Sequence, residues 1–187
     1  VLVGAQAGAP VFSRIQEAIL LDADGLINVP SGTYPGNVDA TSKVVTLSAG
    51  ASPGQVTIAG NLILDSNDTL PMEINGLTAG MSYDQWVVNG PVSLGGATLS
   101  LSGSHVPLLG QTFSILENDD SDVVTGTFNG LPEGALISNF LGSAFLGKVS
   151  YVGGSGNDVT LTVVSPEIFV TGNSFEIVAG LAANVGG

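Results

Sequence analysis

The chain has 187 residues, with 16 Asp plus Glu, 3 Lys plus Arg and no Cys, and its formal net charge is −13. Only 10% of the residues are charged, against about 25% in an ordinary soluble domain, and the shortfall is in cations. Three scattered cations cannot neutralise a nucleic-acid backbone, an anionic membrane surface repels such a chain, and disulfide scaffolds and thiolate sites are excluded.

One short segment has helical periodicity. Apolar residues recur at three- and four-residue spacing over residues 12–19, and Ser13 with Gln16 fits a capping box. We therefore predict a helix over residues 13–21. The chain begins without Met, which we interpret as a piece of a longer product, and we interpret residues 1–7 as an apolar strand rather than a signal-peptide remnant.

The rest of the sequence reads as short strands. Apolar residues alternate with Ser, Thr or Asn, the period-2 pattern of half-buried strands, and turns carry Gly, Asn, Asp or Pro. The predicted strands are residues 26–29, 44–47, 55–58, 62–64, 71–74, 85–88, 92–94, 97–101, 112–116, 123–128, 147–152 and 158–164.

Two all-β architectures accommodate this chain: a right-handed parallel β-helix (solenoid) with a short N-terminal capping helix, or an antiparallel β-sandwich. Residues 44–147 contain no Lys or Arg, although sandwich edge strands are commonly protected by such charges. Stacked coils hide strand edges along their length, so the charge pattern favours the solenoid.

The order of residues 25–47, from Gly-Leu-Ile-Asn-Val-Pro-Ser-Gly-Thr-Tyr to Lys-Val-Val-Thr-Leu, resembles the first coil of pectin-lyase-like right-handed β-helices. In that resemblance residues 15–19 form the capping helix and residues 32–34 close the first corner.

From Gly60 onward the chain is similar to the end of an autotransporter-associated β-strand repeat region of large bacterial surface proteins. After Val164, residues 166–173 look like the opening strand of an immunoglobulin-like choice-of-anchor module. The resemblance implies a modular secreted or surface-attached polypeptide and implies no reaction. The matching pieces include residues 60–62, 72–76, 83–90, 92–99, 126–132 and 151–162.

Many right-handed β-helices act on polysaccharides, and two pairs of carboxylates are candidates for such chemistry. A glycoside hydrolase needs two carboxylates facing one groove at about 5–10 Å, and Asp65 with Asp68, or Glu73 with Asp84, are the candidate pairs. Each residue also reads as a turn residue or a solvated strand end. We expect no enzymatic activity.

Residues 117–122 form the densest acidic cluster, and Asp119, Asp120 and Asp122 are candidate ligands for Ca²⁺, which takes oxygen ligands from flexible acidic loops. Ca²⁺ is the one cofactor that the sequence suggests. The alternative is a solvated hairpin turn between strands 112–116 and 123–128. Residues 153–158 are interpreted as a tight turn.

Aromatic residues and the single histidine complete the candidates. Trp86, Tyr83 and Tyr34 could stack on a neutral glycan, but Trp86 lies in an apolar strand and reads as a core residue. His105 has no second imidazole or thiolate to share a metal, so we interpret it as a loop histidine.

The function predicted from the sequence is structural: a non-enzymatic extracellular or cell-surface link in an adhesin, matrix fibre or filament, with a glycan-binding module or a polysaccharide lyase or hydrolase as the alternative. The expected organisation is residues 1–12 as a strand or linker, 13–164 as the solenoid and 165–187 as a tail. We expect another copy of the chain as partner, through strands that lack a local partner, and neither nucleic acid nor membrane insertion. The predicted assembly residues are Val1, Leu2, Val3, Phe169, Val170, Phe175, Ile177 and Val178.

Overall fold

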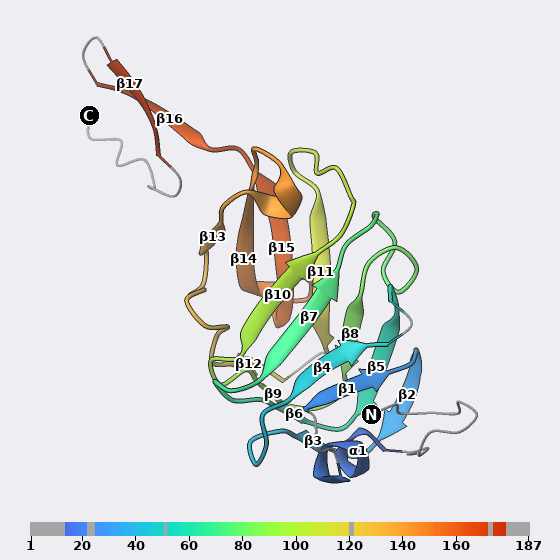
Figure 1. Cartoon of the computed structure of the whole chain (residues 1–187). Coiled ribbons are helices and arrows are strands. Elements are labelled where there is room, and N and C mark those ends of the chain that lie inside the picture. The colour runs from blue at the N-terminus through green and yellow to red at the C-terminus, as the bar shows by residue number, and fades with distance from the viewer. Residues whose placement is uncertain (1–13, 22–24, 51, 120–121, 172–173, 179–187) are drawn as a thin grey trace.

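The computed structural model describes residues 14–21, 25–50, 52–119, 122–171 and 174–178 (Figure 1). Within these ranges the chain forms a helix, α1 (Ile15–Leu21), a short 3-10 turn, η1 (Phe140–Gly142), and strands. The strands are β1 (Leu26–Val29), β2 (Gly32–Pro35), β3 (Val38–Asp39), β4 (Thr46–Ala49), β5 (Gln55–Ala59), β6 (Leu62–Ile63), β7 (Thr69–Glu73), β8 (Gln85–Val88), β9 (Val92–Ser93), β10 (Thr98–Ser102), β11 (Thr112–Asn118), β12 (Val124–Thr125), β13 (Leu136–Ile137), β14 (Leu146–Gly153), β15 (Asp158–Val164), β16 (Glu167–Thr171) and β17 (Ser174–Val178).

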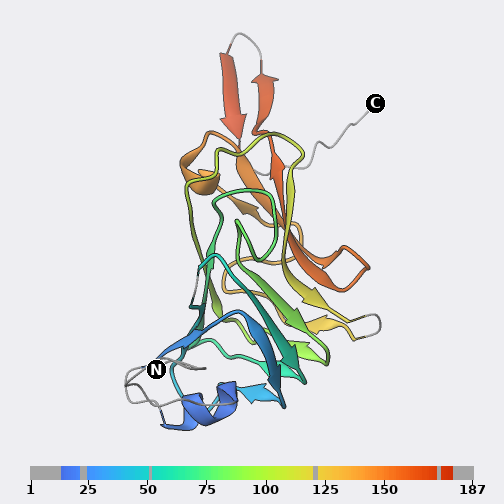
Figure 2. The same ribbon diagram turned by 90° about the vertical axis from the view of Figure 1, so that its right-hand side faces the viewer.

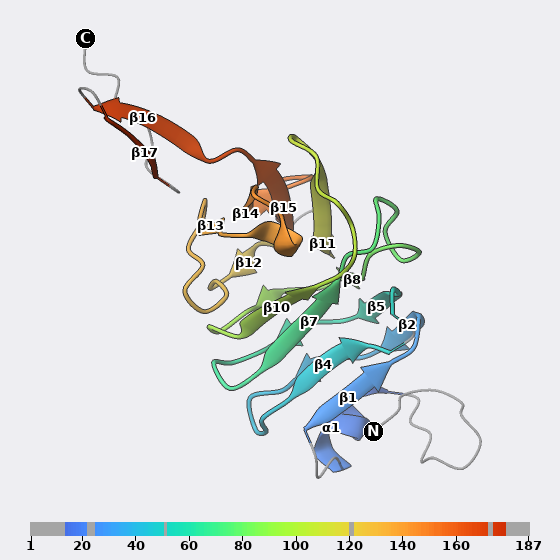
Figure 3. The ribbon, with the colours of Figure 1, turned by 45° about the horizontal axis from the view of Figure 1, so that its top comes forward.

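Each strand from β1 to β9 pairs in parallel with the strand three positions later in the chain. The pairing generates one sheet in the order β1-β4-β7-β10, a second in the order β3-β6-β9-β12, and the parallel part of a third, β2-β5-β8-β11. The chain therefore visits three sheets in turn, four times over, as Figure 3 shows for the successive levels from β1 to β10.

The predicted all-β class is confirmed, and so is the helix. The antiparallel β-sandwich is wrong, because two of the sheets are parallel throughout their described strands. Two local predictions are also wrong. Residues 32–34 belong to strand β2 rather than to a corner, and β11 and β12 form no hairpin, since β11 pairs with β8 and β15 while β12 pairs with β9.

Alternating residues of each strand point into the space between the sheets and stack in register. Val56 of β5 lies beside Trp86 of β8, which lies beside Leu116 of β11, and all three are fully buried. Each apolar side chain is thus covered by the equivalent residue of the next level and removed from water. Burial of apolar surface stabilises the fold by about 25 cal/mol per Å². The columns form one continuous core.

Helix α1 covers the first end of this core. Its buried face comprises Ile15, Ala18 and Ile19, as the predicted periodicity requires. Ser13 of the predicted capping box lies outside the described residues; the side chain of Gln16 donates through Nε2 to the Asp39 carbonyl at 3.0 Å and accepts through Oε1 from the Asp39 N–H at 2.6 Å. Gln16 thus occupies the edge of β3 as a further strand would.

The other end of the core is covered in a different way. β15 adds antiparallel to β11, β14 pairs antiparallel with β15, and β13 pairs with β14, so the largest sheet runs β13-β14-β15-β11-β8-β5-β2. This antiparallel extension covers the edge of only one of the three sheets. The sheet that ends at β10 has no such addition within the described residues.

The hairpin of β16 and β17 stands apart from the body of the molecule (Figure 2). Its two strands pair with each other and form a separate two-stranded sheet. An isolated two-stranded hairpin is marginally stable in water, so we expect this element to be stabilised by pairing with a further strand.

Gln16 provides a test of the first cap. Gln16→Ala removes both bonds to the backbone of Asp39 and leaves the β3 edge to water, so we expect the free energy of unfolding to fall by about 1 kcal/mol. Chemical denaturation measures it. The neighbouring Glu17→Ala variant is the control and should cost less than about 0.5 kcal/mol, and equal losses in the two variants would contradict the capping role of Gln16.

Candidate functional site

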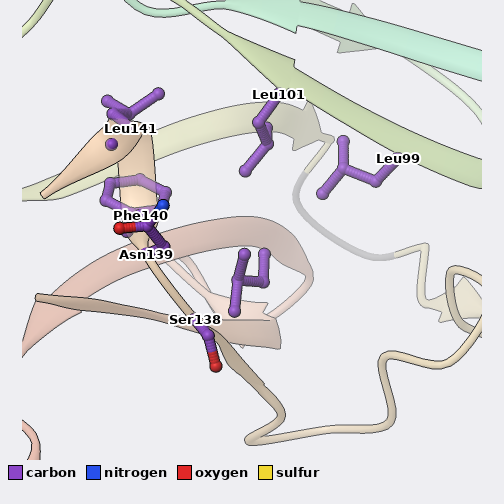
Figure 4. Close-up of a pocket in the computed structure, with 8 residues that line it drawn as sticks. Leu99, Leu101, Ser138, Asn139, Phe140 and Leu141 are labelled. Atoms are coloured by element: carbon purple, nitrogen blue, oxygen red, sulfur yellow. The ribbon is translucent and has the colours of Figure 1, made fainter. Parts of the chain in front are cut away.

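A pocket of about 290 Å³ lies between the last strand of one sheet and the antiparallel extension of another (Figure 4). Leu99 and Leu101 project into it from β10, and the segment of β13 and η1 faces them. These two leucines occupy the inward-facing positions that follow Leu70 and Met72 in the stacked columns. Leu70 and Met72 are fully buried, but Leu99 and Leu101 are only half-buried, because no further level covers them. The lining residues are Leu99, Leu101, Ile137, Ser138, Asn139, Phe140, Leu141 and Gly142.

The wall of this pocket contains two residues in the left-handed backbone region. Asn139 has φ 56° and Leu141 has φ 49°. Asn tolerates this conformation, but Leu rarely adopts it, and such residues cost about 1–3 kcal/mol and concentrate at ligand clamps and binding sites. The backbone strain at Leu141 therefore marks the η1 wall as a functional candidate.

The structure brings together both pairs of carboxylates that the sequence analysis considered. At one corner Ser52 Oγ donates to Glu73 Oε2 at 2.5 Å and lies 3.1 Å from Asp84 Oδ2. The two oxygens of Asp84 also accept backbone N–H bonds, one from Gly54 and one from Glu73, each at 2.8 Å. Asp84 is 3% exposed, so it is neither the turn residue nor the solvated end that the sequence suggested.

Asp68 occupies an equivalent position before β7. It is 1% exposed, and its Oδ1 and Oδ2 accept the N–H groups of Val45 and Asp65 at 3.0 and 2.8 Å. Asp158, at the start of β15, repeats the pattern with the N–H groups of Asn118 and Ser155 at 2.9 and 3.1 Å. Each of these buried aspartates clamps two backbone segments at a corner.

Both oxygens of Asp68 and of Asp84 are thus engaged by the backbone. Burial raises the pKa of both carboxyls, and the accepted N–H bonds lower it in part. The Ser52 hydroxyl lowers the pKa of Glu73. This arrangement fastens successive levels of the core to each other, and it presents no pair of free carboxylates to a substrate.

The acidic loop after β11 lies against the turn between β14 and β15. Asn157 Nδ2 donates to the carbonyls of Asp119 and Asp122, the latter at 2.7 Å, and Asn118 Nδ2 donates to Asp122 at 2.6 Å. Residues 154–157 form the predicted tight turn. Asp120 lies outside the described residues, and among those described no group of three His, Asp or Glu side chains could hold a metal ion. Calcium binding by Asp119, Asp120 and Asp122 stays a prediction.

The aromatic candidates are turned inward. Trp86 is fully buried, as expected of a core residue, and Tyr83 is 6% exposed, while the Tyr34 hydroxyl donates to Pro30 O at 2.9 Å. His105 Nε2 lies 2.9 Å from Gln111 Oε1, in the loop between β10 and β11. The rings of Trp86 and Tyr83 are thus buried in the core, whereas Tyr34 and His105 are partly exposed.

The predicted assembly residues divide between two regions. Val1, Leu2 and Val3 lie outside the described residues, whereas Phe169 and Val170 fall in β16 and the other three in β17. Sequence reasoning identified these strands and missed the pocket at β10. The available signal was the uncharged stretch of residues 85–116, which contains that strand.

The chain was compared with known proteins at three levels, and no family model, curated protein or solved structure matches it. The family resemblances drawn from the sequence therefore stay predictions. In the part of the chain that the structure describes, no helix has the length and apolar character required to span a bilayer.

Asp84 provides a test of the corner clamps. Asp84→Ala leaves the buried N–H groups of Gly54 and Glu73 without partners, at about 1–3 kcal/mol each, so we expect a loss of about 2–4 kcal/mol in the free energy of unfolding. Urea denaturation measures it, with the exposed Glu117→Ala as a control that should change stability by less than about 0.5 kcal/mol. An Asp84→Ala loss as small as that of the control would show that the clamp contributes nothing.

The buried carboxyls also predict a pH dependence. Burial raises the folded-state pKa of Asp68 and Asp84, so their contribution to stability is complete below the unfolded value of about 3.9 and is lost as the pH rises through the folded pKa. The pKa of Glu73 is lowered. Its contribution to stability is therefore lost only as the pH falls below the ordinary pKa of a glutamate, which is outside this window. We therefore expect a higher melting temperature at about pH 5 than at about pH 8.

The control is the double variant Asp68→Asn, Asp84→Asn, in which part of this pH dependence disappears. Measurement in about 1 M salt, where the Debye length is about 3 Å, separates the buried carboxyls from the repulsion of the −13 surface. A melting temperature that rises from about pH 5 to about pH 8 would contradict the assignment.

Proposed function

We propose that this chain is a non-enzymatic structural link that associates with copies of itself through its terminal strands. The observation that carries the proposal is the hairpin of β16 and β17, which stands apart from the body and whose two outer edges pair with no other described strand (Figures 1 and 2). Backbone N–H and C=O groups along such edges are templates for pairing with another chain.

The body is proposed to be a short right-handed parallel β-helix. Its support is the pairing of each strand with the strand three positions later, and connections between parallel strands of one sheet are right-handed in nearly all proteins. A rigid stack of this kind is a suitable spacer, because each level contacts only its neighbours and the length grows by repetition.

The charge of the chain supports a structural role rather than chemistry on a polyanion. The chain carries a formal net charge of −13 with three cations, which repels anionic polysaccharides. The carboxylate oxygens of the buried Asp68 and Asp84 already accept hydrogen bonds from backbone N–H groups. The extracellular, bacterial surface setting is proposed from the resemblance of the sequence to surface-protein repeats alone.

The proposal predicts the behaviour of a truncated chain. Deletion of residues 165–187 removes the hairpin, which pairs with no strand of the body, so we expect a folded monomer where the full chain forms oligomers or fibres. Light scattering coupled to size-exclusion chromatography and electron microscopy measure the change.

The matched control is Val152→Ser, which removes an exposed apolar side chain of β14 (65% exposed) without touching the hairpin, and it should associate as the full chain does. Association of the truncated chain at the level of the full chain would show that the hairpin is not the connector.

A further inference from the structure

We propose that the free edge of β10, together with the pocket beneath it, is the acceptor for strand β16 of a second copy of this chain. The inference rests on the proposed function and adds the receiving surface, which that function leaves open. Because hairpin and acceptor belong to the same chain, every copy is both a donor and an acceptor, as a heterologous contact requires.

The backbone of β10 leaves alternate residues without partners. Thr98 donates to the residue before β7, and Ser102 accepts from the residue after it, each at 2.8 Å. In a parallel pair the bonding residues alternate, so Thr98, Ser100 and Ser102 face β7, while Leu99 and Leu101 direct their N–H and C=O groups to the other side. β10 is the last strand of its sheet in the described residues, so these four groups form a ready ladder for one more strand.

The side chains at this edge are equally incomplete. Leu99 and Leu101 end the inner columns of the sheet and border the pocket of about 290 Å³, whose far wall is β13 and η1 (Figure 4). A strand added to β10 places its inward-facing side chains in register over these two leucines. The pocket therefore has the position that the next level of the stack needs, and its mixed lining includes the apolar side chains of Leu99 and Leu101.

Among the end strands of the three parallel sheets, β2, β3 and β11 are protected, and β12 offers only two residues. Gln16 occupies the edge of β3, Pro35 removes a donor from β2, and β15 covers β11. No charged side chain protects the edge of β10, because residues 85–116 contain no Asp, Glu, Lys or Arg. An unguarded edge of five residues is unusual in a soluble protein and is the kind that accepts another strand.

The occupant is chosen by charge and length. β16 and β10 each have five residues, and β16 carries the uninterrupted apolar run of residues 168–170. β17 has Glu176 at its centre, a charge that blocks edge pairing. The acid at the start of β16, Glu167, meets no like charge along residues 85–116, whereas most of the −13 surface would repel it.

Cysteine cross-linking tests the pairing directly, because the chain has no Cys of its own. Leu99→Cys chains are mixed with chains carrying Ile168→Cys, Phe169→Cys or Val170→Cys and oxidised gently. Neighbouring strands bring Cα atoms within about 4.4–6.8 Å, as a disulfide needs, and side chains alternate between faces. We expect mixed disulfides at 168 and 170 but not 169, or at 169 alone. Replacing Leu99→Cys by Leu21→Cys, at an exposed leucine of α1, should give at least tenfold less.

A second pair of variants separates this inference from the proposed function. Leu99→Lys keeps its charge in water in the single copy but must bury it when a strand covers the pocket, so association should weaken at least tenfold, while the matched Leu21→Lys should associate normally. If deletion of residues 165–187 abolishes association but Leu99→Lys does not, and no alternating cross-link forms, the acceptor is elsewhere and the proposed function stands. If the deletion changes nothing, both are overturned.

Discussion

The parallel pairing of each strand with the strand three positions later is the constraint on which the rest of the structure depends. It satisfies strand edges along the whole stack and places equivalent apolar residues, such as Val56, Trp86 and Leu116, over each other. The same constraint leaves unpaired edges only at the two ends. The strands between the ends therefore need no charged residues to prevent edge pairing, whereas the strand edges at the two ends need a cover or a partner.

The two ends are dealt with differently. At the first, α1 covers the core and Gln16 bonds to the backbone of Asp39. At the second, β15 closes the sheet that contains β11, and within the described residues no strand is added to β10, which borders the pocket. Between the ends, buried Asp68 and Asp84 fasten successive levels through backbone N–H groups. The five-residue edge of β10 is uncharged and has no partner strand within the described residues.

Strands with alternating apolar residues, such as residues 55–58, were predictable because this periodicity directly reflects burial on one face. β2 was missed because Gly32 and Pro35 read as turn residues, and β13 because two residues carry no period. The burial of Asp68 and Asp84 was missed because a buried aspartate and a turn aspartate have the same sequence signature; the clue was their position directly before a strand. The open edge of β10 depends on which strands pair, and no local pattern encodes that.

Residue-resolved hydrogen exchange on β10 tests the central claim most directly. In the chain without residues 165–187, the amides of Leu99 and Leu101 should exchange rapidly while those of Ser100 and Ser102 are protected by β7, and in assembled full-length chains all four should be protected. Equal protection of the four amides in the truncated chain, or rapid exchange of Leu99 and Leu101 in the assembly, would contradict the account.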